Sequence, residues 1–366
     1  MARLLLAVML ALSTGLSLSC SRTPARERPV GRTVLALQDH ERSHYVEDRP
    51  RPVLTHLWYP APEGPEETAW QVGVFNMGYG AVDAPLAGSS ERYPLIVMSH
   101  GTGGAAAQLS WMAETLATHG YVVAAVNHHG NTAAEPSYLP QGFALWWERA
   151  QDLSFVIGAL LDHPKYRARI DPGRIGALGF SLGGWTVLTL AGARVDLERW
   201  EKACAEAPER AGCALPPEAT FEISELERLA RDNPIYRASR ARAGQSFSDP
   251  RVRAVVALAP SIGFSFDPAS LREVPIPVAL KVGAKDDQAP PEETTQIEAH
   301  VPDASLDILP EVGHYTFLAP CTLRGRWLAP DLCREPGGAN RRALHAEVSV
   351  AARTFFDAKL ERSPGK

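Results

Sequence analysis

The fold is decided by one stretch, Gly179-Phe180-Ser181-Leu182-Gly183-Gly184. A short apolar strand is predicted before it, over 174–178, and a helix-forming run follows over 185–193. This order of strand, tight turn and helix is typical of a turn that lifts a serine hydroxyl clear of a sheet. The glycines are expected because a neighbouring Cβ would clash, and Ser181 should have a strained backbone. The alternative is an ordinary glycine-rich turn between strand and helix, which the flanking elements disfavour.

Composition limits the classes of protein to consider. The 366 residues are 45% hydrophobic and 22% charged, enough for one large domain or two. The formal net charge is −5 and the isoelectric point is about 6.1. Without a basic excess, nucleic acid is not an expected partner. No internal run is long and apolar enough to span a bilayer.

The N-terminus has the pattern of an export signal. A basic residue precedes the apolar run Leu4–Leu18, which small residues follow, so residues 1–19 are predicted to be a signal peptide. The alternative is a hydrophobic first helix of the domain. Leu16-Ser17-Leu18-Ser19-Cys20 also resembles a bacterial lipobox, apart from its serine at 17, and predicts lipidation of Cys20. Residues 20–31 are predicted to be a flexible tether.

Four further cysteines follow: Cys204, Cys213, Cys321 and Cys333. An even number in an exported chain indicates disulfide bonds. Of the three possible pairings, Cys204–Cys213 with Cys321–Cys333 is favoured because short loops close more readily. Metal binding is disfavoured because the chain has no Cys-x-x-Cys and no zinc-like spacing.

Apolar strands alternate with helices along residues 32–366, which predicts an α/β fold with a mostly parallel sheet covered on both faces. Two strands over 33–38 and 53–59 are expected to form an antiparallel start. Residues 194–250 are charged and break the alternation, so they are interpreted as an insertion over or beside the active-site end. The other expected elements are strands at 93–99, 121–126, 252–258, 276–282 and 305–309, and helices near 109–120, 141–161, 222–231 and 340–360.

A serine nucleophile needs a base within hydrogen-bond reach and an acid that orients the base. In a fold of this kind the acid follows a buried strand downstream of the serine, and the base follows the last strand. Asp286 comes directly after the strand at 276–282, and its neighbour Asp287 is the competing candidate. His314 follows the strand at 305–309 in a loop with Gly313. The alternatives are a solvated acidic turn and a surface histidine.

Backbone amides are expected to bind the oxyanion that forms during acyl transfer. The predicted donors are the amide of Leu182, next to the nucleophile, and the amide of Thr102, in the loop after the strand at 93–99. His100 precedes the serine and is interpreted as a residue that braces this loop. His128 and His129 either line the pocket or are ordinary polar loop residues.

Together these motifs resemble the α/β-hydrolases over roughly residues 33–360. The nearest branch is similar to bacterial dienelactone-hydrolase-like proteins and plasma-type platelet-activating-factor acetylhydrolases. Dienelactone hydrolases themselves use a cysteine, where this chain has Ser181. The resemblance implies no metal and no organic cofactor. The motifs that carry it are His100-Gly101-x-Gly103-Gly104, Asp171-Pro172-x-Arg174-Ile175, Gly179–Gly184, Gly283-x-x-Asp286, Gly313-His314, Leu57–Pro60 and Asn127–Gly130.

The motifs and the resemblance predict a serine hydrolase of carboxylic esters. The N-terminal pattern and the four further cysteines predict export, to the periplasm or cell surface or as a secreted protein. Short-chain acyl esters are the first expectation for its substrate. A phospholipid acetylhydrolase and a polyester hydrolase are alternatives within this class. A non-catalytic binding protein on the same fold is the alternative from another class, and a peptidase is disfavoured because no added peptide-binding domain is evident.

Overall fold

The computed structural model describes residues 28–361. The predicted signal peptide, Cys20 and most of the predicted tether lie outside the described residues. The first strand begins at Val30, inside the segment predicted to be tether. Among the helices of the described part, none has the length and hydrophobicity needed to cross a membrane.

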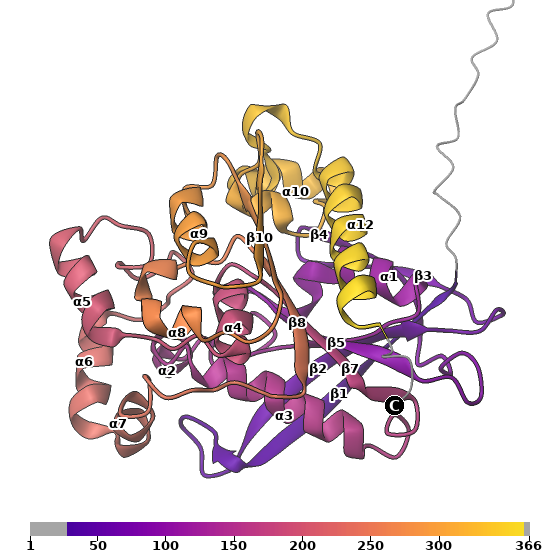
Figure 1. Cartoon of the computed structure of the whole chain (residues 1–366), viewed down its shortest axis with the longest axis horizontal. Helices are drawn as coiled ribbons and strands as arrows, with labels where there is room; N and C mark the ends of the chain where they lie inside the picture. The colour runs from indigo at the N-terminus through magenta and orange to yellow at the C-terminus, as the bar shows by residue number, and fades with distance from the viewer. Residues whose placement is uncertain (1–27, 362–366) are drawn as a thin grey trace, which may run out of the picture.

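One sheet of ten strands runs through the molecule in the order β10-β9-β8-β7-β5-β6-β2-β1-β4-β3 (Figure 1). Neighbours from β10 to β6 are parallel, whereas β2 pairs antiparallel with β6 and with β1. The α/β fold with a mostly parallel sheet is therefore confirmed. The strands are β1 Val30–Ser43, β2 Pro50–Pro60, β3 Thr68–Val72, β4 Phe75–Val82, β5 Tyr93–Ser99, β6 Val122–Val126, β7 Ile170–Phe180, β8 Val252–Leu258, β9 Val278–Gly283 and β10 Ala304–Leu309.

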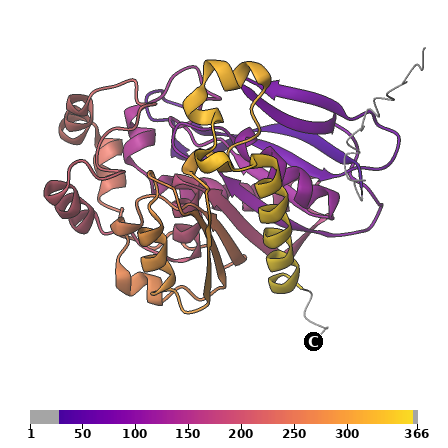
Figure 2. The ribbon, with the colours of Figure 1, turned by 90° about the horizontal axis from the view of Figure 1, so that it is seen from above.

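Helices cover both faces of this sheet (Figures 1 and 2). Side chains alternate along β5, so that Leu95 and Val97 pack into one core, with α3 and α4, while Ile96 and Met98 pack into the other, with α1 and α12. The helices are α1 Ser110–Thr118, α2 Pro140–Ala144, α3 Glu148–Asp162, α4 Leu182–Ala191, α5 Leu197–Glu206, α6 Ile223–Asp232, α7 Pro234–Arg240, α8 Pro268–Arg272, α9 Pro291–Glu298, α10 Leu323–Leu328, α11 Pro330–Cys333 and α12 Arg341–Lys359.

The single helix predicted over 141–161 is wrong. The segment forms α2 and α3, separated by residues 145–147. The backbone of Leu145 leaves the helical region at φ −104° and ψ 60°. Tertiary contacts explain the break. The indole of Trp147 donates to Ser239 Oγ at 2.9 Å. Gly142 packs closely on Gly130, because a Cβ added at Gly142 would lie 2.3 Å from the carbonyl carbon of Gly130. These contacts override the apolar helical periodicity.

The central strand β7 begins earlier than the predicted strand over 174–178. Residues 171–174 lie within β7 as an irregularity, because the pairing with β5 shifts register between Ile170 and Ile175. Residues 194–250 carry α5, α6 and α7 between α4 and β8. These three helices lie at one end of the molecule, opposite the β3–β4 hairpin (Figures 1 and 2).

Candidate active site

Ser181 stands at the tip of the turn between β7 and α4. Its φ of 56° and ψ of −123° are strained values for a residue with a side chain. The turn is possible because a Cβ at Gly179 would lie 2.0 Å from the carbonyl oxygen of Gly183, and one at Gly183 would lie 2.0 Å from that of Ser99. The amide of Ser181 donates to the Leu258 carbonyl at 2.9 Å, which fixes the turn against β8. The predicted strain and the need for both glycines are therefore present.

His314 and Asp286 converge on this serine from two later loops. His314 begins the short 3-10 helix η3, His314–Phe317, after β10, and its Nε2 lies 2.9 Å from Ser181 Oγ. Its Nδ1 lies 2.8 Å from Asp286 Oδ2 and 3.0 Å from Oδ1. All three side chains are buried. A serine hydroxyl, an imidazole and a carboxylate in this order form a chain along which a proton can move from the serine to the imidazole.

Asp286, rather than Asp287, lies against the imidazole. Asp286 Oδ1 also accepts the amides of Gln288 at 3.0 Å and Ala289 at 2.7 Å, so the turn itself orients the carboxylate. Asp287 is exposed and faces the neighbouring cavity. Backbone donors keep the carboxylate of Asp286 pointed at His314.

Thr102 and Leu182 line the same cavity as Ser181. Leu182 is the first residue of α4, where helix amides have no partner within the helix. Buried side chains hydrogen-bond to the loop that carries Thr102 and hold it in place. Asn131 Oδ1 accepts the amide of Gly103 at 2.7 Å, and the guanidinium of Arg149 donates to the His100 carbonyl.

A second buried array lies behind this loop. His128 Nε2 lies 2.8 Å from Ser99 Oγ, and its Nδ1 lies 2.9 Å from Asp152 Oδ2. Burial lowers the pKa of His128 to about 3. Burial alone would raise the pKa of Asp152, but the charges of Arg51 and Arg42, each 2.7 Å from its Oδ1, hold that pKa well below its usual value. This array repeats the residue types of the candidate active site without access to solvent, so it is structural.

His100 and His129, the other two histidines considered for the site, have structural contacts. His100 Nδ1 contacts the Gly101 carbonyl at 2.7 Å, and His100 Nε2 accepts the amide of His128 at 3.2 Å, so His100 braces the loop as predicted. His129 Nδ1 lies 2.8 Å from Glu135 Oε1. Neither His128 nor His129 lines the cavity, so the hypothesis that they do is wrong.

A cavity of about 890 Å³ opens beside Ser181. Helices α2, α5, α6 and α7 supply much of its wall, which combines aromatic and aliphatic side chains with the carboxylates Glu209, Glu218, Glu227 and Asp287. Arg210 and Arg240 also reach the cavity, but Glu293 accepts from Arg210 at 3.2 Å and Glu201 accepts from Arg240. The apolar lining includes Tyr138, Phe143, Trp146, Trp200, Leu215, Ile223, Leu226 and Tyr236.

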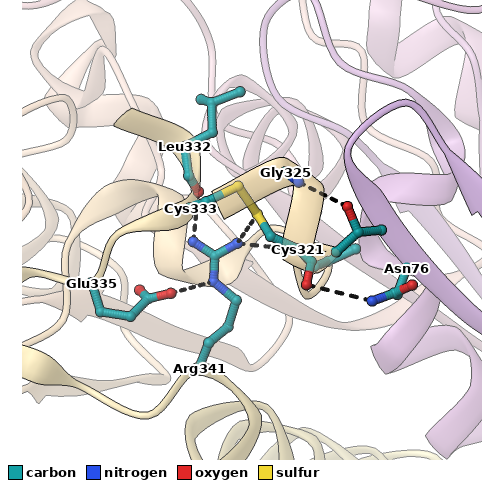
Figure 3. The surroundings of a disulfide bond; sticks show 9 residues. Asn76, Cys321, Gly325, Leu332, Cys333, Glu335 and Arg341 are labelled. Atoms are coloured by element: carbon teal, nitrogen blue, oxygen red, sulfur yellow. Dashed lines mark hydrogen bonds and ion pairs between the residues drawn. A yellow bond between two sulfur atoms is a disulfide. The ribbon is translucent and has the colours of Figure 1, made fainter. Parts of the chain in front are cut away.

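Both predicted disulfides are present, Cys204–Cys213 and Cys321–Cys333. Cys213 itself lines the cavity, so the first bond fixes part of the cavity wall. The second closes the segment that carries α10 and α11 (Figure 3). Among residues 28–361, no group of three or more His, Cys, Asp or Glu side chains is arranged to hold a metal ion.

Sequence reasoning missed the residues that support the site. Asn131, Arg149 and Asp152 are all buried, and their contacts join parts of the chain that are far apart. A signal was present in α3, where Arg149 and Asp152 stand among the buried positions of an amphipathic helix. Charged residues on such a face are buried only when they are paired, so they predict a polar network without naming its partners.

Comparison with known proteins agrees with the fold. The sequence model of "Platelet-activating factor acetylhydrolase, isoform II" matches residues 66–149. Cutinase est1 of Thermobifida alba is 30% identical over 135 residues, which are 36% of this chain and 41% of that protein. Platelet-activating factor acetylhydrolase of Bos taurus is 36% identical over 77 residues, which are 19% of this chain and 17% of that protein. The match thus spans about two fifths of the length of the cutinase.

A solved structure of a ferulic acid esterase from Streptomyces cinnamoneus superposes with a TM-score of 0.61. The superposition covers 94% of each chain at 22% sequence identity. With the strand order and the strained serine turn, it shows that this chain has the α/β-hydrolase fold. The predicted resemblance is confirmed at that level, and the similarity to the platelet-activating-factor acetylhydrolases is carried by residues 66–149.

Proposed function

We propose that the protein is a serine hydrolase that cleaves carboxylic esters, with Ser181, His314 and Asp286 as its catalytic triad. One observation carries the proposal. His314 lies 2.9 Å from Ser181 Oγ and 2.8 Å from Asp286 Oδ2, beside a cavity of about 890 Å³. A cavity of this size can accept a small-molecule ester.

The reaction follows from the geometry. Ser181 Oγ attacks the ester carbonyl while His314 Nε2 takes the hydroxyl proton, and the imidazolium then returns that proton to the leaving alcohol. Asp286 holds the tautomer of His314 that leaves Nε2 free to accept. The amides of Thr102 and Leu182 bind the oxyanion. Water, activated by the same imidazole, then releases the acid from the acyl-enzyme and restores Ser181.

Short-chain acyl esters are the proposed substrates. The relatives support an ester of some kind, because they are named as cutinases and as a platelet-activating factor acetylhydrolase. A polyester and an acetylated phospholipid are therefore the alternative substrates. A series of nitrophenyl esters of increasing acyl length, measured beside an acetylated phospholipid and a polyester film, ranks these classes by kcat/KM.

The proposed compartment is outside the cytoplasm. Two disulfide bonds in the described residues are supporting observations, because such bonds persist in oxidising environments. We also propose that residues 1–19 are removed and that Cys20 is acylated, which would attach the enzyme to a membrane face. Mass spectrometry of the exported protein tests both statements, and an intact Met1 with an unmodified Cys20 would contradict them.

Ser181→Ala tests the catalytic proposal itself. Loss of the hydroxyl should lower kcat on the order of 10⁶-fold, as in other serine triads. A fluorophosphonate should label the natural protein at Ser181 and leave the variant unlabelled. The rival hypothesis of a non-catalytic binding protein predicts no turnover of any ester and no labelling of Ser181. Full activity in a folded Ser181→Ala protein would refute the mechanism.

A further inference from the structure

Helix α10 presents three apolar side chains to solvent. Leu323 is 87% exposed, Trp327 is 82% exposed and Leu328 is 50% exposed. All eight tryptophans of the chain lie within the described residues, and Trp327 is the only exposed one among them. We name Leu323, Trp327 and Leu328 the α10 face. Side chains of this size are normally withdrawn from water unless they meet another surface.

The α10 face stands on a rigid base (Figure 3). The bond between Cys321 and Cys333 closes the segment, and the amide of Thr322 donates to the Val74 carbonyl at 2.9 Å. Buried Arg341 donates to the Leu332 carbonyl at 2.6 Å and to Glu335 Oε1 at 2.6 Å. The carbonyl of Ala319 accepts from the same guanidinium at 3.1 Å. The α10 face is therefore exposed on a segment that a disulfide and several hydrogen bonds hold in place.

The segment that carries the α10 face and the start of the next helix also carry exposed positive charge. Arg324, Arg326, Arg334 and Arg342 are all exposed, and within residues 28–361 none of the four forms an ion pair. Asp331 is the one exposed carboxylate of the segment 321–342. The whole chain carries a net charge of −5, so this cationic region runs against the overall charge. A partner that complements it is anionic.

The segment that carries the α10 face also reaches the cavity through a neighbouring helix. Leu332, in α11 of the same disulfide-closed segment, lines the cavity together with Tyr315 and Leu318 of the loop that begins at His314. In Figure 1, α10 lies in the upper part of the molecule between α9 and α12. A surface that binds the α10 face would therefore lie beside the candidate active site.

We propose that the α10 face docks the protein onto an anionic lipid bilayer. Leucine and tryptophan side chains would enter the boundary between headgroups and acyl chains, where an indole is favoured. The four arginines would contact lipid phosphates. A stable protein partner needs about 800 Å² from each side, which a six-residue helix with three apolar side chains does not provide. The proposal does not depend on ester hydrolysis, since it concerns binding alone.

Quenching by brominated lipid tests the proposal in the full chain carrying Ser181→Ala, which cannot process the lipid by the proposed mechanism. Vesicles of brominated phosphatidylglycerol should quench part of the tryptophan fluorescence, and Trp327→Phe should abolish that quenching. Trp70→Phe, a change in β3 outside the cavity lining, is the matched control and should retain it. The quenching that Trp327→Phe removes requires contact by Trp327 itself, so an acyl chain on Cys20 would not reproduce it. Equal quenching in the Trp327→Phe protein would overturn the proposal.

Vesicle affinity provides the second measurement. The double variant Leu323→Ser/Trp327→Ser should bind phosphatidylglycerol vesicles at least tenfold more weakly, because two large apolar side chains no longer enter the lipid. The control Val46→Ser/Val350→Ser, which changes exposed apolar residues elsewhere, should bind as the parent does.

Arg324→Gln/Arg326→Gln should weaken vesicle binding on the order of fivefold for each arginine removed. Thermal unfolding of every variant checks that the fold is intact. Equal binding to phosphatidylcholine and phosphatidylglycerol would overturn the proposal, and so would concentration-dependent dimerisation without vesicle binding, which would indicate a second copy of this chain as the partner.

Discussion

Asn131 Oδ1 accepts the amide of Gly103 at 2.7 Å, so a buried side chain after β6 holds the loop after β5. Asn131 is itself fixed, because its Nδ2 donates to the Gly142 carbonyl at 3.1 Å. Gly103 directly follows Thr102, whose amide is a proposed oxyanion donor. The peptide directly after this donor is therefore held by a residue that does not line the cavity, and it fixes the position of the adjoining Thr102 amide.

Asn131→Ala should lower kcat about 10- to 100-fold and leave KM within about twofold. The reason is that a displaced donor stabilises the transition state less, while loss of one donor altogether costs about 10²- to 10³-fold. Steady-state kinetics with a soluble nitrophenyl ester measure both constants. Asn340→Ala, which removes the N-terminal cap of α12, is the control and should reduce stability by about 1 kcal/mol without changing kcat. A rise in KM alone would contradict the assigned role of Asn131.

Asp286→Asn should lower kcat about 10⁴-fold, because an amide in contact with His314 Nδ1 favours the wrong tautomer. Asp287→Asn changes an exposed neighbour and should alter kcat less than about threefold. The two proteins form a matched pair, since each loses one negative charge from the same turn. If Asp287→Asn has the larger effect, the acid of the triad has been assigned to the wrong residue.

The sequence predicted those features that local patterns determine. The strained Ser181 follows from glycine spacing between a strand and a helix, and the positions of Asp286 and His314 follow from the carboxyl ends of two strands. In a parallel sheet these ends meet at one edge, so residues far apart in the chain come together by topology alone. The two disulfide pairings followed from loop length.

Features made by contacts between distant segments were not predictable in this way. The break between α2 and α3 depends on Gly130 and Ser239, which no local pattern in the segment reveals. The network of Arg42, Arg51 and Asp152 joins two parts of the chain about a hundred residues apart. Long-range packing of this kind overrides local propensity and leaves little trace in one sequence.

Loss of the Cys204–Cys213 bond should affect both stability and substrate binding. Cys204→Ser/Cys213→Ser should lower the free energy of unfolding by about 3 kcal/mol, the value expected for closing a loop of this length. KM should rise as well, because Cys213 and its neighbours line the cavity. Urea denaturation and kinetics on the same preparation measure the two effects.

Cys321→Ser/Cys333→Ser is the control for the Cys204–Cys213 variant. The Cys321–Cys333 bond closes a loop of similar length, so its loss should also lower the free energy of unfolding by about 3 kcal/mol. In either pair the sheet should survive, because each bond closes a short segment outside the central strands. An unchanged KM in Cys204→Ser/Cys213→Ser would show that the bond does not hold the cavity wall.

His345 should make the folded state sensitive to acid. Its ring stacks on Trp111 at 3.9 Å between centroids, and its Nε2 donates to the Thr316 carbonyl at 2.9 Å. Burial lowers the pKa of His345 from 6.5 to about 3. Between these values the unfolded chain binds a proton at this residue that the folded protein does not bind. The contribution of neutral His345 to the free energy of unfolding is therefore complete above pH 6.5 and is lost as the pH falls towards 3.

His345→Gln should remove this dependence while keeping a donor for Thr316. From pH 6 down to pH 4, the free energy of unfolding of the natural protein should fall more steeply than that of the variant, by about 1.4 kcal/mol per pH unit. Urea titrations at each pH measure the two slopes. His40→Gln, at an exposed histidine, is the matched control. Parallel curves for the natural protein and His345→Gln would show that His345 takes up its proton equally in the folded and unfolded states.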